Sequence, residues 1–169
     1  MPVDTIFICY ENICRSPMAE GIFSELLIRN NLQHFFSVRS AGTVSYQQGS
    51  MPDDRAITAL NSLGIDISSL RARSIDDLDL NTCDWIFVMD HENYEEISRC
   101  CIAQKKPRIH MVMDFVAGRC GEAVPDPYYG TPKEFERVMN DLVIASEQIL
   151  LRMFAEYPYV KSGAFPGIP

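Results

Sequence analysis

The 169-residue sequence lacks three features: an excess of positive charge, a long apolar run and cysteine pairs at metal-binding spacing. Its formal net charge of −8 argues against nucleic acid as a partner, because phosphate backbones attract basic surfaces. No apolar run approaches the length of a membrane-spanning helix, and the chain does not open with a basic segment followed by an apolar one. We therefore expect a cytoplasmic protein with no membrane partner.

The six cysteines and three histidines do not form the patterns that disulfide frameworks or zinc sites require. A chain of this length can bury a core without disulfides, so reduced thiols are expected. No Cys-x2-Cys pair is present, and the histidines lie apart from the cysteines in the sequence. The sequence thus predicts neither a metal nor any other cofactor.

Residues 9–16 combine a cysteine and an arginine in a predicted loop between a strand and a helix. A loop of this kind directs backbone N–H groups at whatever lies above the helix N-terminus, which suits an anion. The helix dipole, the loop amides and the guanidinium of Arg15 all favour the thiolate form of Cys9. Arg15 can also donate two hydrogen bonds to one phosphate. The loop therefore predicts a nucleophile beside a phosphate-binding site.

Strand and helix patterns alternate along the chain and predict a single α/β domain. Strands are expected at residues 5–8, 37–40, 84–89 and 108–112, and helices at 17–28, 53–63, 90–100 and 131–155, with a helical turn at 74–77. They form a four-stranded parallel sheet with helices on both faces, within a domain of residues 1–156 followed by an irregular tail, 157–169. Asp53 and Asp90 are expected to cap their helices. The polar motifs at 9–16, 40–43 and 90–93 each follow a strand and should meet at one edge of the sheet.

The Cys-x5-Arg-Ser motif closing the first strand resembles the signature of the low-molecular-weight protein tyrosine phosphatase family. Further motifs occur in the family's order, and together they cover about residues 4–152: 40–43, 64–66, 72–73, 88–90 and 125–130. The resemblance implies hydrolysis of phosphotyrosine in a protein or peptide, through a cysteinyl-phosphate intermediate. It leaves the physiological substrate and the oligomeric state open.

The resemblance also implies catalytic roles for Cys9, Arg15 and Asp126, and a hydrogen-bonding role for Ser16. Cys9 is the nucleophile, and Arg15 clamps the phosphate. Ser16 donates to the cysteine sulfur. Asp126 precedes Pro127, a pair that fits an ordinary turn and a projecting carboxylate equally well; the resemblance favours a general acid that later acts as a base.

The remaining site residues fall into support, binding and protective groups. The resemblance implies that Asn12 and Ser40 hold the loop in shape through hydrogen bonds, and Asn also tolerates left-handed backbone. Cys14 is implied to protect Cys9 from irreversible oxidation. Phosphate or substrate binding is assigned to the loop residues and three tyrosines that would line an aromatic slot: Tyr10, Glu11, Asn12, Ile13, Cys14, Ser16, Tyr46, Tyr128 and Tyr129.

Two positions depart from the family pattern. Glu11 stands where the family usually has Gly, and a carboxylate beside a phosphate is unfavourable. Leu70 stands where the family often has a His that belongs to the loop-support network. We expect these changes to make catalysis weaker or more selective, and normal efficiency that is unchanged in Glu11→Gly would refute this expectation.

Three other functions are alternatives to this interpretation of the sequence. An arsenate reductase needs additional redox cysteines in a mobile segment, whereas Cys83 precedes a buried strand. In a protein arginine phosphatase the position of Ile13 tends to be small and polar. The third alternative is a phosphotyrosine-binding module with weak turnover, and only Glu11 and Leu70 favour it.

Overall fold

The computed structural model describes residues 1–101 and 108–157, which contain a four-stranded parallel sheet in the order β2-β1-β3-β4. The strands are β1 (Val3–Cys9), β2 (Phe36–Gly42), β3 (Trp85–Val88) and β4 (Arg108–Met111). Strand β1 pairs with both β2 and β3, and β3 pairs with β4, in every case in parallel. The four predicted strands and their parallel arrangement are therefore confirmed.

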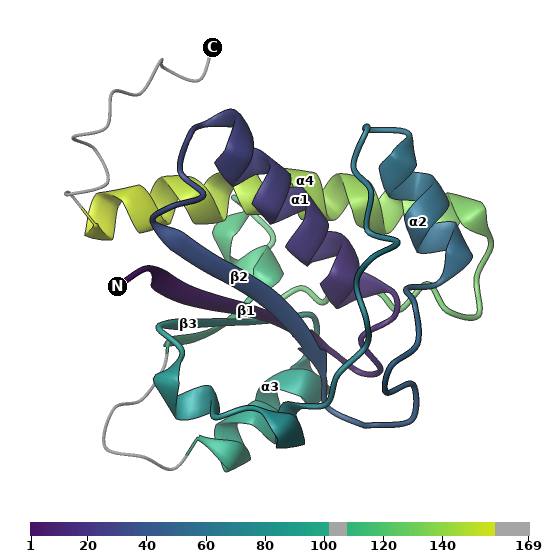
Figure 1. The fold of residues 1–169 in the computed structure, drawn as a ribbon, viewed down its shortest axis with the longest axis horizontal. Coiled ribbons are helices and arrows are strands. Elements are labelled where there is room, and N and C mark those ends of the chain that lie inside the picture. Colours follow the sequence, from purple (N-terminus) through teal and green to yellow (C-terminus); the bar gives the residue numbers. More distant parts are fainter. Residues whose placement is uncertain (102–107, 158–169) are drawn as a thin grey trace.

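Four helices cover the two faces of this sheet: α1 (Arg15–Arg29), α2 (Asp54–Asn61), α3 (His91–Cys100) and α4 (Pro132–Glu156). Figure 1 shows α1, α2 and α4 on one side of the strands and α3 on the other. Three short 3₁₀ helices connect these elements: η1 (Ile75–Asp77), η2 (Leu80–Thr82) and η3 (Val112–Phe115). The predicted helices on both faces are thus confirmed.

Alternation of side chains along the central strands produces two separate cores. On one face, Phe7 of β1 and Phe87 of β3 stack at 5.3 Å and join the larger core beneath α1 and α4. On the other face, Ile6 and Ile86 join the smaller core with Ile97 of α3. All five side chains are fully buried, which explains why β3 and the second half of β1 are apolar.

Side-chain caps fix the beginnings of three helices near the carboxyl ends of the strands. Asp53 accepts a hydrogen bond from the backbone N–H of Arg55 at the start of α2, and Asp90 accepts one from Asn93 at the start of α3. Thr131 and Glu134 form a capping box at the start of α4. The two predicted aspartate caps are confirmed.

The strand order places one pair of loops at the functional edge. The chain leaves β1 for α1 on one face of the sheet and leaves β3 for α3 on the opposite face. The neighbouring carboxyl ends of β1 and β3 therefore flank a topological switch point, where ligands bind in such sheets.

None of the helices in the described part of the chain is both long and apolar enough to cross a membrane. The predicted irregular tail lies, apart from Tyr157, outside the described residues.

Candidate active site

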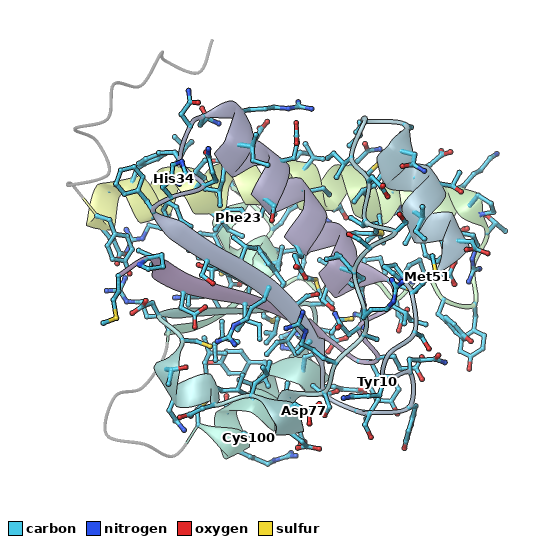
Figure 2. All side chains as sticks on the ribbon, viewed as in Figure 1. Tyr10, Phe23, His34, Met51, Asp77 and Cys100 are labelled. Atoms are coloured by element: carbon cyan, nitrogen blue, oxygen red, sulfur yellow. The ribbon has the colours of Figure 1, made fainter. Side chains whose placement is uncertain are left out.

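The loop of residues 9–16, called the phosphate loop below, leaves β1 and runs into the first turn of α1. Figure 2 shows Tyr10 of this loop at the end of the molecule opposite His34, which follows α1. A pocket opens at the loop, lined by Cys9, Tyr10, Glu11, Ile13, Cys14, Arg15, Asp126 and Tyr128. The three residues expected to catalyse therefore meet in one pocket, although Asp126 lies more than a hundred positions from Cys9.

Cys9 and Ser16 contact each other at the base of this pocket. The Cys9 Sγ lies 2.9 Å from the Ser16 Oγ, and both residues are buried. The Asn12 Nδ2 donates to the Ser16 Oγ at 2.9 Å, so the oxygen already accepts a hydrogen bond. The hydroxyl proton of Ser16 is therefore free to point at the Cys9 sulfur. The other acceptor in reach, the Ala41 carbonyl oxygen, lies farther from the Ser16 Oγ, at 3.4 Å.

Asn12 organises the inside of the phosphate loop. Its backbone has φ of 59°, in the left-handed region that Asn tolerates. Besides the bond to Ser16, its Nδ2 donates to the Ser40 Oγ at 2.8 Å and its Oδ1 accepts from the backbone N–H of Arg73 at 3.0 Å. These side-chain contacts connect the phosphate loop to β2 and to the segment after α2, as expected for support residues.

Glu20 extends this network and was not predicted from the sequence. The Ser40 Oγ donates to the Glu20 Oε2 at 2.6 Å, and burial raises the pKa of the Glu20 carboxyl. Glu20 follows Ser16 by about one helical turn, so both side chains lie on the same face of α1. That four-residue spacing is the signal that could have identified it.

Leu70, where the family often has a His, contributes packing to this region. Its side chain is partly buried against the larger core. The hydrogen bonds of Asn12 and Ser40 go to Ser16, Glu20 and the Arg73 backbone. The predicted loosening of the loop by this substitution stays a prediction.

Arg15 is buried and already paired with carboxylates on two other loops. Its Nη1 lies 2.6 Å from Asp90 Oδ2 and donates to the Val124 carbonyl at 2.9 Å, while its Nη2 lies 3.3 Å from Asp126 Oδ2. Burial lowers the pKa of Arg15, but Cys9, Asp126 and Asp90 outweigh burial and raise it overall. The pairing with Asp90 follows from the strand order, which sets the ends of β1 and β3 side by side.

Asp126 occupies an exposed turn at the rim of the pocket. Its side chain is 47% exposed, and its Oδ1 accepts from the backbone N–H of Tyr128 at 3.1 Å. The backbone N–H of Gly130 donates to the Pro127 carbonyl at 2.8 Å and closes the turn. Both expected interpretations hold here, because the Asp-Pro pair forms a turn and that turn also brings the carboxylate to the pocket.

The predicted aromatic slot is only partly formed by the expected tyrosines. Tyr128 lines the pocket, and Tyr10 does so as well. Tyr46 and Tyr129 are not among the pocket-lining residues. They are 74% and 97% exposed, and their ring centroids lie 6.3 and 5.0 Å from those of Tyr10 and Tyr128. That these two tyrosines contact the substrate stays a prediction.

Cys14 lines the same pocket as Cys9 and is a buried free thiol. All six cysteines are free in the structure. Burial, and then the nearby carboxylate of Asp53, raise the pKa of Cys14, so it remains a thiol at neutral pH. Within residues 1–101 and 108–157, no group of three or more His, Cys, Asp or Glu side chains is placed to hold a metal ion.

Comparisons with known proteins agree over nearly the whole chain. The family model of low molecular weight phosphotyrosine protein phosphatase matches residues 4–157. The low molecular weight protein-tyrosine-phosphatase YfkJ of Bacillus subtilis is 32% identical over 148 residues, covering 88% of this chain and 94% of that protein. The low molecular weight phosphotyrosine protein phosphatase of Homo sapiens is 34% identical over 140 residues, covering 82% and 87%. A crystal structure of protein tyrosine phosphatase from Entamoeba histolytica, with Hepes in the active site, has a TM-score of 0.84 at 35% identity and covers 90% of this chain and 97% of that one.

Proposed function

The chain belongs to the low-molecular-weight phosphotyrosine protein phosphatase family and is a phosphoric monoester hydrolase, and we propose that it hydrolyses phosphotyrosine through a cysteinyl-phosphate intermediate. The observation that carries the proposal is the meeting of Cys9, Arg15 and Asp126 in one pocket. A nucleophile, a phosphate clamp and a proton donor are the three groups that this reaction needs.

In the first step the Cys9 thiolate attacks phosphorus, and the bond from phosphorus to the tyrosine oxygen breaks. Arg15 and the backbone N–H groups of the phosphate loop hold the non-bridging oxygens. Protonated Asp126 gives its proton to the departing phenolate oxygen. The exposed position of Asp126 at the rim suits this role, because the leaving group faces the mouth of the pocket.

In the second step water attacks the cysteinyl-phosphate. Asp126, now a carboxylate, takes a proton from the water, and the bond from sulfur to phosphorus breaks. The Ser16 hydroxyl, 2.9 Å from the sulfur, stabilises the departing thiolate. The net reaction converts phosphotyrosine and water to tyrosine and inorganic phosphate, and it regenerates both Cys9 and the protonation state of Asp126.

The pocket walls support an aromatic substrate over the other functions considered. Ile13 is buried and lines the pocket together with Tyr128, so the walls are apolar where a phenyl ring would lie. That lining opposes the guanidinium of a phosphoarginine. Cys83 is buried beside Arg39, in the smaller core on the other face of the sheet from Cys9, which opposes an arsenate reductase relay.

Glu11 is proposed to weaken binding of the phosphate dianion, since it lines the same pocket. Glu11 is thus a specificity element that favours substrates with a neighbouring cation. We expect Glu11→Gly to lower the inhibition constant of inorganic phosphate by about threefold to tenfold, from a repulsion on the order of 1 kcal/mol in water. An unchanged constant together with normal efficiency of the wild type would contradict this role.

Cys14 is proposed to protect Cys9 in a reducing cytoplasm. A peroxide oxidises the Cys9 thiolate to the sulfenic acid, which then condenses with the Cys14 thiol to form a disulfide and release water. The six free thiols support the cytoplasmic assignment. We also propose residues 1–156 as the catalytic domain.

The test is release of phosphate from p-nitrophenyl phosphate and from a phosphotyrosine peptide, without added metal. Cys9→Ser should abolish turnover, and Asp126→Ala should reduce it most for the peptide, whose phenolate is the poorer leaving group. Retained phosphopeptide binding without turnover by the wild type would instead favour a binding module.

A further inference from the structure

Arg55, in the first turn of α2, lies outside the lining of the catalytic pocket but contacts the segments on both sides of it. Its guanidinium holds Asp53 with two hydrogen bonds, from Nε to Oδ1 at 2.9 Å and from Nη2 to Oδ2 at 2.7 Å. This fork fixes the plane of the guanidinium, since both ends of one carboxylate are engaged. The hydrogen bonds lower the pKa of Asp53, so the pair stays charged.

Asp53 connects this pair to the phosphate loop. Its backbone N–H donates to the Ile13 carbonyl at 2.8 Å. Its side chain also caps α2 through the backbone N–H of Arg55. The start of α2 is thus fixed against the loop that carries Cys9 and Arg15.

The other edge of the Arg55 guanidinium holds residues 125–130, called the acid loop below. Nη1 donates to the Gly130 carbonyl at 2.9 Å, and Nη2 donates to the Tyr128 carbonyl at 3.0 Å. These two carbonyls lie on the turn that follows Asp126, and the N–H of Tyr128 donates to the Asp126 carboxylate. Arg55 therefore holds Tyr128 by its carbonyl, while the N–H of the same residue orients the carboxylate.

Packing completes the attachment. The Arg55 guanidinium lies 4.5 Å from the centroid of the Phe135 ring, and Phe135 is fully buried in α4. The Arg55 side chain itself is only 31% exposed. An exposed arginine that merely solvates a helix end would need neither the aromatic contact nor four directed hydrogen bonds to three different residues.

We propose that Arg55 is a positioning residue that holds the acid loop in register with the phosphate loop, so that Asp126 reaches the leaving-group oxygen. The inference rests on the proposed role of Asp126 as general acid. Lysine cannot replace Arg55, because one ammonium group cannot engage a carboxylate and two carbonyls in a common plane. Loss of the clamp affects proton transfer to the leaving group and leaves phosphate binding by the phosphate loop in place.

The test compares wild type, Arg55→Gln, Arg55→Lys and Asp126→Asn on two substrates. For phenyl phosphate, whose leaving group is poor, we expect Arg55→Gln to lower kcat/KM by about tenfold to a hundredfold, a part of what a general acid contributes. For p-nitrophenyl phosphate the loss should be below about threefold, since a good leaving group needs little protonation. The inhibition constant of inorganic phosphate should stay within about twofold, because Arg55 does not contact the phosphate loop's binding groups.

The double variant Arg55→Gln/Asp126→Asn separates positioning from general destabilisation. If Arg55 acts through Asp126, Arg55→Gln changes kcat/KM by less than about twofold once Asp126 is absent. Arg99→Gln, which removes an exposed arginine of α3 that pairs with Glu95 and Glu96, is the control for charge loss and should match wild type. Arg55→Lys keeps the positive charge and provides the comparison should Arg55→Gln fold poorly.

Three outcomes overturn the inference. Equal losses on both substrates, or a weakened phosphate constant, would make Arg55 a general structural residue. If Arg55→Gln leaves kcat/KM unchanged while Asp126→Asn loses more on the poorer leaving group, the inference about Arg55 is wrong and the proposed function stands. An Asp126→Asn variant without leaving-group dependence would overturn the proposed function as well, so the two failures are distinguishable.

Discussion

Asn12 combines a backbone conformation and a hydrogen-bond network that few side chains could provide together. Asn12→Ala removes its three side-chain hydrogen bonds and leaves alanine in the left-handed region. We expect the free energy of unfolding to fall by about 2–4 kcal/mol, from about 1 kcal/mol for each net hydrogen bond and a similar cost for the backbone. Denaturant unfolding measures this change.

Asn12→Gly is the matched control, because glycine loses the same bonds and accepts the left-handed backbone without strain. It should be more stable than Asn12→Ala. Turnover should be reduced to the same extent in both variants, since Ser16 loses the hydrogen bond from the Asn12 side chain in each. Equal stability of the two variants would show that the positive φ contributes nothing.

Glu20 gives the protein a pH dependence of stability. Burial raises the folded pKa of Glu20 above its unfolded value, so its contribution is full below the unfolded pKa and is lost as pH rises through the folded pKa. We expect Glu20→Gln to gain stability relative to wild type as pH rises from about 4 to 7, because the amide stays neutral. Denaturant midpoints at several pH values measure the difference.

Glu147, an exposed glutamate on α4, supplies the control. Glu147→Gln should follow the pH profile of the wild type. A difference between Glu20→Gln and wild type that stays constant over the whole range would exclude the carboxyl as its source.

Single residues were predictable where the chemistry is local. Cys9, Asn12 and Arg15 share one loop, so their combination is visible in the sequence. Glu20 and Arg55 were missed because their partners, Ser40 and the acid loop, become neighbours only when helices pack on the sheet. The sequence likewise does not show which of several nearby tyrosines line the pocket, and only Tyr10 and Tyr128 are among the lining residues.

At the scale of elements, the end of β2 approaches the phosphate loop so closely that it requires glycine. A Cβ at Gly42 would lie 2.7 Å from the Tyr10 carbonyl oxygen and 2.9 Å from the Glu11 carbonyl carbon. Both are backbone atoms and cannot rotate away. We expect Gly42→Ala to displace the phosphate loop from β2, with an overpacking cost of about 1–3 kcal/mol and at least a tenfold weaker phosphate constant.

Ala41→Gly, at the neighbouring fully buried position, controls for a disturbed β2 strand. It should lower stability by about 1 kcal/mol and leave the phosphate constant unchanged. Normal phosphate binding by Gly42→Ala would show that the loop tolerates a shift away from β2.

The types of the elements were predictable because the hydrophobic periodicity and the capping residues agreed. The residues at which some elements end were not predictable. The strand expected to reach residue 112 ends at Met111, where Asp114 accepts from the Met111 backbone and η3 begins. The helix expected to reach residue 63 ends at Asn61, because Ser62 donates its hydroxyl to the Ala59 carbonyl and the chain turns. Local side-chain hydrogen bonds of this kind compete with regular structure.

For the whole molecule, the net charge of −8 opposes the approach of an anionic substrate. The charge of Arg15 is balanced by Asp90 and Asp126, so it does little to offset that field at a distance. Raising ionic strength from about 20 to 200 mM should increase kcat/KM for an acidic phosphopeptide about twofold to fivefold, because screening shortens the range of repulsion.

A phosphopeptide flanked by lysines should show the opposite trend, and kcat should change for neither peptide. Steady-state kinetics at four salt concentrations would decide between these trends. Identical salt dependence of the two peptides would mean that the field of the whole molecule does not reach the pocket.

The ion pairs of Arg15 also have a consequence for the order in which the molecule is made. The phosphate loop leaves the ribosome first, but its partners Asp90, Val124 and Asp126 follow 75, 109 and 111 residues later. Contacts this distant in sequence form late in folding. Phosphate therefore stabilises only chains whose two halves have joined, since a ligand that binds the folded state alone shifts the balance toward it. Binding of phosphate thus distinguishes chains whose two halves have joined from chains that are still folding.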